Sequence, residues 1–202
     1  MSQALARSPV AEIVAELLTD VARQAEAAAV LGIADVSLEA RCGCKGPGTI
    51  AWLDSLAVPV PAKPNTWLPL GEGGRIARLG MTEFLVEGDA AVVERLTTTP
   101  RAAGVYPVQH EDAALILGGA RVNELLRQTC NVNFAALDAA DRPVVLTSLI
   151  GVGVTVLPEQ AAQGLIYRIW CDGSYGRYLF ETLHDIAHEL GGGTVFPQYL
   201  YA

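Results

Sequence analysis

The segment Ala113–Leu126, AALILGGARVNELL, places a run of apolar residues directly before two glycines and an amphipathic stretch. An unbroken apolar run such as Ala113–Leu117 is typical of a buried strand. Gly118–Ala120 then opens a helix, because the apolar residues beyond it recur at helical spacing. The inward positions of this helix are Val122, Leu125 and Leu126. The segment predicts a sheet with a helix packed on it.

A second strand–glycine–helix segment occurs earlier, around Lys45-Gly-Pro-Gly48. In both halves of the chain the glycine-led helix is followed by strands and a further helix. When Gly46 is aligned with Gly118, the two segments are separated by about 72 residues, which is longer than the usual period of a solenoid repeat. We predict an α+β protein made of two similar βα-rich units in one compact domain. Chance recurrence of a common α+β order is the alternative.

The other predicted elements follow from alternation, turn residues and capping residues. Val58–Pro64 contains three prolines, so we expect a stiff extended connection there. Asp89 is placed to cap a helix over residues 90–96, and Gly191 to end a helix over residues 175–190. The expected strands are Val36–Ala40, Arg75–Leu79, Glu83–Glu87 and Leu165–Trp170, with a hairpin over 144–157 around Gly151.

The first 34 residues are predicted to form a separate element, an N-terminal amphipathic helix. Ser8 and Pro9 make a helix start, since serine caps free amides and proline tolerates the first turn. Apolar residues then recur at helical spacing as far as about Val30. Residues 35–202 are expected to form the main domain.

Charge and hydropathy exclude several classes of function. The net charge of −8 offers no basic stripe for phosphates, so we expect neither nucleic acid nor an anionic membrane as partner. The most apolar run, Val144–Leu157, is interrupted by polar residues and glycines and is too short to span a bilayer. The N-terminus does not resemble a secretion signal. Together these features favour the cytoplasm.

Cysteines and histidines give weak indications of metal binding. Cys42 and Cys44 are separated by one residue, whereas zinc-binding pairs usually have two to four between them. His184 and His188 stand one helical turn apart, but Asp185 occupies the position where a zinc protease needs glutamate. No third ligand is evident, so we predict no metal site. The cysteines are expected to be buried small side chains, and the histidines to belong to a solvated or partner-facing polar helix face, with metal binding as the alternative.

Motifs for catalysis or cofactor binding are absent from the sequence. It contains no GxGxxG or Walker pattern, and Lys45-Gly-Pro-Gly48 has the place of a phosphate loop without its pattern. No Gly-x-Ser-x-Gly elbow occurs. We therefore expect no catalytic residue and no cofactor on this chain, and we identify no cofactor-binding residue.

Several motifs together resemble the gamma subunit of heterotetrameric sarcosine oxidases. They are Pro64-Asn-Thr66, Leu79-Gly-Met-Thr-Glu-Phe-Leu85, Leu117–Leu126, Tyr167-Arg-Ile-Trp170 and Ser174-Tyr-Gly-Arg-Tyr-Leu179. The resemblance spans roughly Val36 to Leu190, so residues 35–202 are expected to be a gamma-like domain. It also implies a fold related to part of the folate-binding glycine-cleavage T protein.

The resemblance implies a non-catalytic subunit docked on larger flavin-bearing alpha-type and beta-type chains. In that arrangement FAD, FMN, NAD and tetrahydrofolate belong to the partner chains. The complex would oxidise sarcosine, another N-methyl amino acid or a secondary amine. A stand-alone folate or one-carbon binding protein of T-protein type is the alternative, with Asp172 and Tyr175 as candidate pterin contacts.

A partner subunit would cover exposed side chains, and two regions are predicted to form that interface. One is a polar stripe on the last long helix, and the other is a ridge around the first glycine-led helix. Tryptophan and arginine are common interface anchors, although Trp52 could equally be core. The predicted interface residues are Lys45, Trp52, Arg177, Glu181, His184 and His188.

Overall fold

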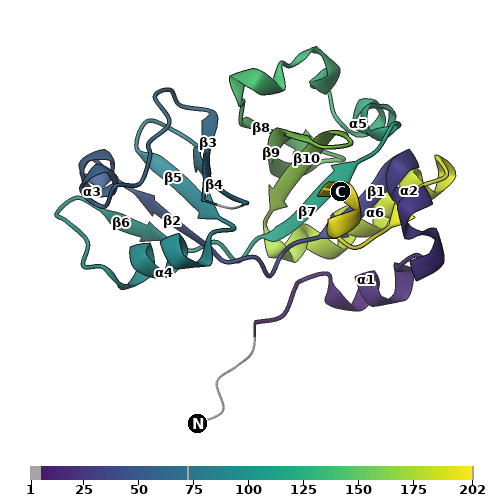
Figure 1. The fold of residues 1–202 in the computed structure, drawn as a ribbon, viewed down its shortest axis with the longest axis horizontal. Coiled ribbons are helices and arrows are strands. Elements are labelled where there is room, and N and C mark those ends of the chain that lie inside the picture. The colour runs from purple at the N-terminus through teal and green to yellow at the C-terminus, as the bar shows by residue number, and fades with distance from the viewer. Residues whose placement is uncertain (1–5, 72, 202) are drawn as a thin grey trace, which may run out of the picture. The chain divides into compact units, whose positions relative to one another are not determined.

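Two separate β-sheets organise the chain in the computed structural model, which describes residues 6–71 and 73–201. The first unit contains the described parts of Met1–Leu38 and Val145–Ala202, together with Glu111–Ala140. The second contains the described part of Glu39–His110, and Asp141–Val144. Each unit combines one sheet with helices (Figure 1), which confirms the predicted α+β class.

The sheet of the first unit has six strands in the order β8-β9-β10-β7-β1-β11. Its neighbouring strands are antiparallel except for β1 and β11, which are parallel. The strands are β1 (Gly32–Asp35), β7 (Ala113–Gly118), β8 (Val145–Leu149), β9 (Val152–Ala161), β10 (Gly164–Cys171) and β11 (Gly193–Thr194).

Most helices of the first unit pack on one face of this sheet, whereas Leu200 near the C-terminus lies against Gly118 on the other face. Their apolar positions, such as Leu125 on α5 and Leu183 on α6, pack against Leu117 and Tyr167 in one continuous core. The α-helices are α1 (Ala11–Leu17), α2 (Gln24–Leu31), α5 (Val122–Thr129), α6 (Gly176–Glu189) and α7 (Gln198–Tyr201). Short 3₁₀ turns are η1 (Val21–Arg23), η2 (Phe134–Ala136), η3 (Ala139–Asp141) and η4 (Gly173–Tyr175).

The sheet of the second unit has five antiparallel strands in the order β3-β4-β5-β2-β6. Trp52 and Leu53 on α3 and Leu96 on α4 pack against Phe84 and Ile76 of the sheet. The strands are β2 (Arg41–Lys45), β3 (Thr66–Leu70), β4 (Gly74–Arg78), β5 (Glu83–Glu87) and β6 (Tyr106–Val108). The helices are α3 (Thr49–Ser55) and α4 (Ala90–Thr98).

The prediction of two similar units is confirmed by the order of their elements. The chain runs β2-α3-β3-β4-β5-α4-β6 in the second unit and β7-α5-β8-β9-β10-α6-β11 in the first. Four strands also take the same places, since β3-β4-β5-β2 matches β8-β9-β10-β7. The equivalent glycines are Gly46 and Gly119, with φ of 119° and 111°, so the offset at this junction is one residue longer than predicted.

The single N-terminal helix predicted before residue 34 is interrupted. After α1, Leu18 forms a parallel bridge with Thr194, and the Thr19 amide donates to the Thr194 carbonyl at 2.9 Å. Asp20 then caps η1, its side chain accepting from the Ala22 amide. The pairing with β11 therefore breaks the helix and makes this segment part of the first unit. Residues 1–5 of the predicted segment lie outside the described residues.

The strand predicted over Val36–Ala40 is also wrong. The structure has strands on either side, β1 and β2, and a turn between them. Asp35 Oδ1 accepts from the Ser37 amide at 2.9 Å, the local hydrogen bond by which Asp starts turns. Leu38 is consequently 61% exposed rather than facing a core.

The other predicted strands and helices are present, and Val58–Pro64 has no regular structure. The buried guanidinium of Arg78 fixes the middle of this connection, because its Nη1 donates to the carbonyls of Pro61 and Ala62 at 3.0 and 3.1 Å. Arg78 thereby ties the connection to β4. Its neutral acceptors satisfy a charged group that would be costly to bury alone.

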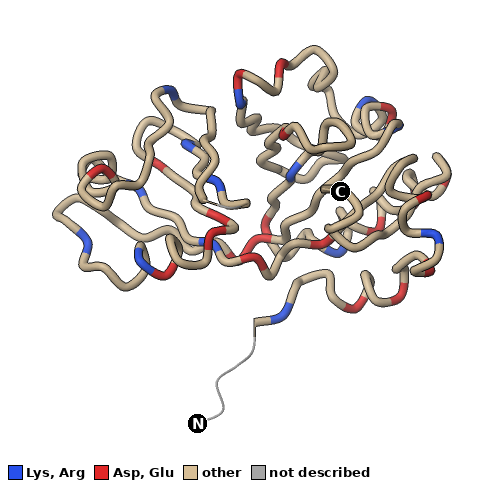
Figure 2. Tube along the Cα trace, in the orientation of Figure 1, with Lys and Arg blue, Asp and Glu red and all other residues tan. Residues whose placement is uncertain are grey.

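Charged residues are distributed over both units. Figure 2 shows Lys and Arg scattered along the described trace, with acidic residues between them. Among the described residues, no helix has the length and apolar composition needed to cross a membrane.

Candidate functional site

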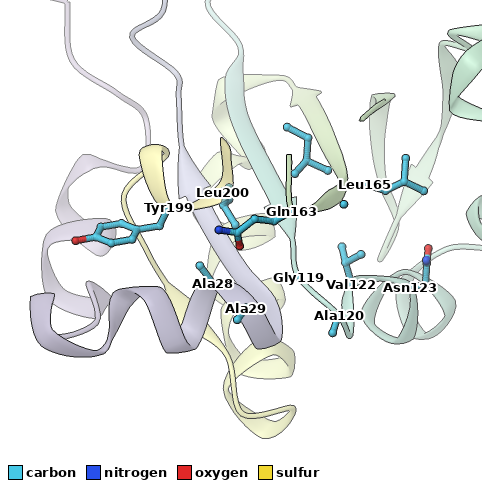
Figure 3. A pocket seen from close by; sticks show the side chains of 12 residues that line it. Ala28, Ala29, Gly119, Ala120, Val122, Asn123, Gln163, Leu165, Tyr199 and Leu200 are labelled. Carbon is cyan, nitrogen blue, oxygen red and sulfur yellow. The ribbon is translucent and has the colours of Figure 1, made fainter. Parts of the chain in front are cut away.

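A pocket of about 390 Å³ lies within the first unit, where α2, the β7–α5 junction, the β9–β10 turn and α7 meet. Figure 3 shows Asn123 on one side, Tyr199 on the opposite side and Gln163 between them. The remaining lining is small or aliphatic. The twelve lining residues are Ala28, Ala29, Gly119, Ala120, Val122, Asn123, Gln163, Gly164, Leu165, Ile166, Tyr199 and Leu200.

The floor of this pocket is built from one end of α2 and the start of α5. The amides of Ala120 and Arg121 donate to the carbonyls of Ala29 and Val30, each at 2.9 Å. The two carbonyls therefore accept from backbone amides at the start of α5 that could otherwise bind an anion. Gly119 is required here, because a Cβ would lie 2.7 Å from two backbone oxygens, at positive φ. The junction is therefore a structural joint and not a phosphate cradle.

The amide of Asn123 is the polar group of the pocket whose orientation is fixed. Its Oδ1 accepts from the hydroxyl of Tyr167 at 2.9 Å. Tyr167 is fully buried, and burial raises the pKa of its phenol while the bond to Asn123 opposes that rise. The phenol therefore keeps its proton, which it donates to Asn123 in this structure. Neither residue is predicted as a site residue from the sequence, because they are 44 positions apart and only the packing of α5 on the sheet brings them together.

The predicted interface residues of the second unit have different surroundings. Lys45 is exposed at the end of β2. Trp52 is only 5% exposed, belongs to the core of α3 and the sheet, and donates from Nε1 to the Pro100 carbonyl at 3.3 Å. The core role that the sequence left open for Trp52 is the one observed.

The predicted stripe on α6 is divided between exposed and buried residues. Arg177 and His188 are exposed, and Arg177 Nε lies 2.8 Å from Glu181 Oε1. His184 is 8% exposed, and its Nδ1 lies 2.9 Å from Thr194 Oγ1. Burial lowers the pKa of His184, His188 lowers it further, and Asp185 opposes the shift. His184 is therefore a neutral core side chain and not part of an exposed stripe.

The histidine pair does not form a metal centre with other side chains. The rings of His184 and His188 are 6.2 Å apart between centroids. In the described part of the chain, no three His, Cys, Asp or Glu residues are grouped so that they could hold an ion. The His184–Thr194 contact resembles a base beside a nucleophile, but His184 is buried on α6 and Thr194 is fully buried on β11.

Burial also makes three of the four cysteines poor ligands and nucleophiles. It raises the pKa of Cys42 to about 11 and that of Cys44 to about 12, while Arg101 opposes both shifts. Burial raises the pKa of Cys171 to about 11, with Asp112 and Asp172 adding to the shift. A thiol must ionise before it attacks or binds a metal. These side chains act as small core residues.

Buried charges cluster on the strands of the second unit. Glu87, which is fully buried, lies 3.0 Å from Arg41 and 3.2 Å from Arg75, its cross-strand neighbours on β2 and β4. Arg75 also lies 3.6 Å from Glu39. Two carboxylates thus face two guanidinium groups. Such mutual neutralisation is typical of a structural cluster, since a catalytic carboxylate needs a reactive proton or lone pair.

The two candidate pterin contacts are elsewhere. Asp172 Oδ1 accepts from the Ser174 hydroxyl at 2.6 Å and from the Ser174 amide at 2.8 Å, and these two bonds lower the pKa of Asp172. Tyr175 is 55% exposed at the start of α6. Neither residue lines the pocket.

Solved structures of other proteins share this fold, and two of them illustrate the similarity. One chain of the heterotetrameric sarcosine oxidase from Corynebacterium sp. U-96, in complex with pyrrole 2-carboxylate, matches with a TM-score of 0.67 and 19% identity over 93% of this chain and 97% of that chain. The glycine cleavage system aminomethyltransferase T from Bartonella henselae matches with a TM-score of 0.68 and 17% identity, over 98% of this chain and 61% of that chain.

The comparisons confirm the fold predicted from the resemblance. This chain spans about three fifths of the aminomethyltransferase and nearly the whole length of the matched sarcosine oxidase chain. No protein-family model and no curated protein sequence matches the chain.

Proposed function

We propose that this chain is a non-catalytic subunit of a sarcosine-oxidase-type complex, in the position of the gamma subunit. The observation that carries the proposal is the correspondence with 97% of one chain of a heterotetrameric enzyme, covering 93% of this chain. Fold alone does not determine function. The surroundings of the chain's own reactive groups add independent support.

Those groups are used in structure and not in chemistry. His184 is neutral and buried against Thr194, and Glu87 is neutralised by two arginines. The buried thiols have raised pKa values. We therefore assign the oxidation of an N-methyl amino acid or secondary amine to alpha-type and beta-type partner chains. FAD, FMN, NAD and tetrahydrofolate are assigned to those chains as well.

The partner interface is proposed to involve the exposed members of the predicted set, Lys45, Arg177 and His188, together with the half-buried Glu181. Trp52 and His184 can contribute only by supporting the fold of their own units. Residues 35–202 remain proposed as the gamma-like domain. We propose the cytoplasm as the compartment, since all four cysteines are free thiols.

Co-expression with an alpha-type and a beta-type chain of a sarcosine-oxidase-type complex tests the proposal. We expect a stoichiometric complex after affinity purification and gel filtration. Lys45→Glu and Arg177→Glu should raise the Kd on the order of tenfold, because reversing an interface charge replaces attraction by repulsion. Lys63→Glu and Arg127→Glu, exposed positions in the same two units, are the matched controls. A chain that remains separate from such partners at micromolar concentration contradicts the proposal.

A stand-alone folate-binding protein is the second candidate, favoured by the fold shared with aminomethyltransferase T. The pocket of the first unit fits folate poorly, because no acidic side chain lines it to accept from the pterin and no basic side chain lines it to pair with the glutamate tail. Titration calorimetry of the chain alone with tetrahydrofolate separates the two candidates. Tight one-to-one binding would support the folate protein.

A further inference from the structure

The pocket of the first unit has a chemical character that the subunit proposal does not use. Nine of its twelve lining residues are glycine, alanine or larger aliphatic residues, and no Asp, Glu, Lys, Arg or His is among the twelve. A charged ligand would lose its hydration there without gaining a counter-charge. The lining therefore favours a neutral molecule with a mainly apolar body.

The pocket walls are held in place before any ligand enters. The bonds from Ala120 and Arg121 to the carbonyls at the end of α2 join two walls directly. Gly119 allows this close approach, as no residue with a Cβ could. A volume of about 390 Å³ lies within the range typical of small-molecule sites. A preformed site of this kind avoids the entropic cost of ordering its walls upon binding.

Asn123 supplies a directional polar contact. Because its Oδ1 accepts from the buried Tyr167 hydroxyl, its Nδ2 is held as the donor side of the amide. Tyr167 thus acts as a positioning residue that selects which end of the amide is available. A ligand contacting Nδ2 must offer an acceptor, such as a carbonyl oxygen or an unprotonated ring nitrogen.

We propose that this pocket binds a neutral small molecule with an apolar, ring-sized body and a carbonyl or ring-nitrogen acceptor directed at Asn123 Nδ2. The inference is independent of the subunit proposal, because every residue it uses belongs to the first unit. Leu165, Ile166 and Leu200, which line the pocket, supply apolar contacts to the ring. Gln163 borders it on the side of the β9–β10 turn (Figure 3).

Three ligands of similar shape test this chemistry on the full chain. Acetophenone has the ring and the acceptor, ethylbenzene has the ring alone, and benzoate has the ring with a negative charge. Binding is followed by ¹H–¹⁵N correlation NMR at the Asn123 side-chain amide and the Gly119 and Gly164 backbone amides. We expect acetophenone to bind with a Kd on the order of 1 mM, as is typical of a ligand of this size. Ethylbenzene should bind about fivefold more weakly, and benzoate more weakly still.

Two variants make the test specific. Asn123→Asp retains an acceptor for Tyr167 but removes the donor, so it should weaken acetophenone at least fivefold and leave ethylbenzene nearly unchanged. Ala120→Phe, on an exposed position at the pocket wall, should prevent binding of both. A well-dispersed spectrum shows that each variant is folded, and Ala29→Phe on the facing wall replaces Ala120→Phe if that variant is not.

Several results would overturn the inference. They are equal affinities for acetophenone and ethylbenzene, shifts confined to residues outside the pocket, and unchanged acetophenone binding by Asn123→Asp. Loss of partner association in Ala120→Phe, with the spectrum intact, would reassign the pocket to a protein contact and likewise overturn it. If Ala120→Phe still associates with the partner chains but no longer binds acetophenone, the inference is supported. This outcome does not depend on whether Lys45→Glu and Arg177→Glu weaken the complex.

Discussion

Arg41 Nη2 lies 3.0 Å from Glu87 Oε2 across strands β2 and β5, with the Arg41 side chain 4% exposed and that of Glu87 fully buried. Arg75 approaches the other oxygen of the same carboxylate at 3.2 Å. Glu87 therefore compensates two buried cations at once. The attraction between such buried charges adds little net stability, but removing one partner is costly because it leaves the other charges buried without a counter-charge.

Glu87→Gln should lower the free energy of unfolding by about 3–5 kcal/mol, because two buried guanidinium groups lose their shared counter-charge. Urea unfolding followed by circular dichroism measures the change. Glu83→Gln, at the other end of β5 and half-buried, is the matched control and should cost less than about 0.5 kcal/mol. Similar losses in both variants would show that the ion cluster contributes little.

Trp52→Ala should destabilise the lone chain by about 3–5 kcal/mol, since it opens a cavity among Leu53, Phe84 and Val93. Ile50→Ala, on an exposed position of the same helix, should cost less than about 1 kcal/mol. Thermal unfolding of the isolated protein gives both values. If Trp52→Ala left stability intact but weakened the partner complex, the interface role would be restored.

His184 should make the chain less stable in mild acid. Its folded-state pKa is lowered, chiefly by burial, so the unfolded chain takes up a proton below about pH 6.5 while the folded chain resists it. The stability is complete above that pH and declines as the pH falls towards the lower folded-state pKa. Urea unfolding at pH 7.5 and 5.5 measures the decline.

His184→Asn should reduce this pH dependence, because the variant has no group that titrates at position 184. His188→Asn, an exposed position one turn along α6, is the control: it removes only the smallest cause of the lowered His184 pKa and should preserve most of the pH dependence. An unchanged decline in His184→Asn would assign the acid sensitivity to other groups.

Cys44 and Cys171 should resist alkylation in the folded chain. At pH 8 a thiol with a pKa near 11 is ionised to about one part in a thousand, and burial also blocks access. Mass spectrometry after iodoacetamide treatment should find both unmodified until the chain is unfolded in guanidinium. Rapid native labelling of Cys44, suppressed by added zinc, would instead indicate a reactive site at Cys42 and Cys44.

The local sequence was sufficient to predict an element wherever nearby residues alone determined where that element begins or ends. The apolar run before Gly118, the capping side chain of Asp89 and the glycine at 191 each act within a few residues of the element they define. The same holds for the repeated order of elements, because each glycine-led helix carries its own signal. The α+β class and the two similar units could therefore be predicted from the sequence.

Tertiary structure decided the features that depend on distant partners. The helical pattern of residues 10–30 does not reveal that Leu18 pairs with Thr194, a contact with the last strand that interrupts the helix. His184 and His188 lie one turn apart on α6, yet only His184 is buried, against Thr194 of β11. Asn123 gains its fixed orientation from Tyr167, on a different element. Hydrogen bonding and burial at these positions depend on residues that are distant in the sequence and that the fold brings together. The periodicity of apolar residues along the chain does not indicate which distant residues meet.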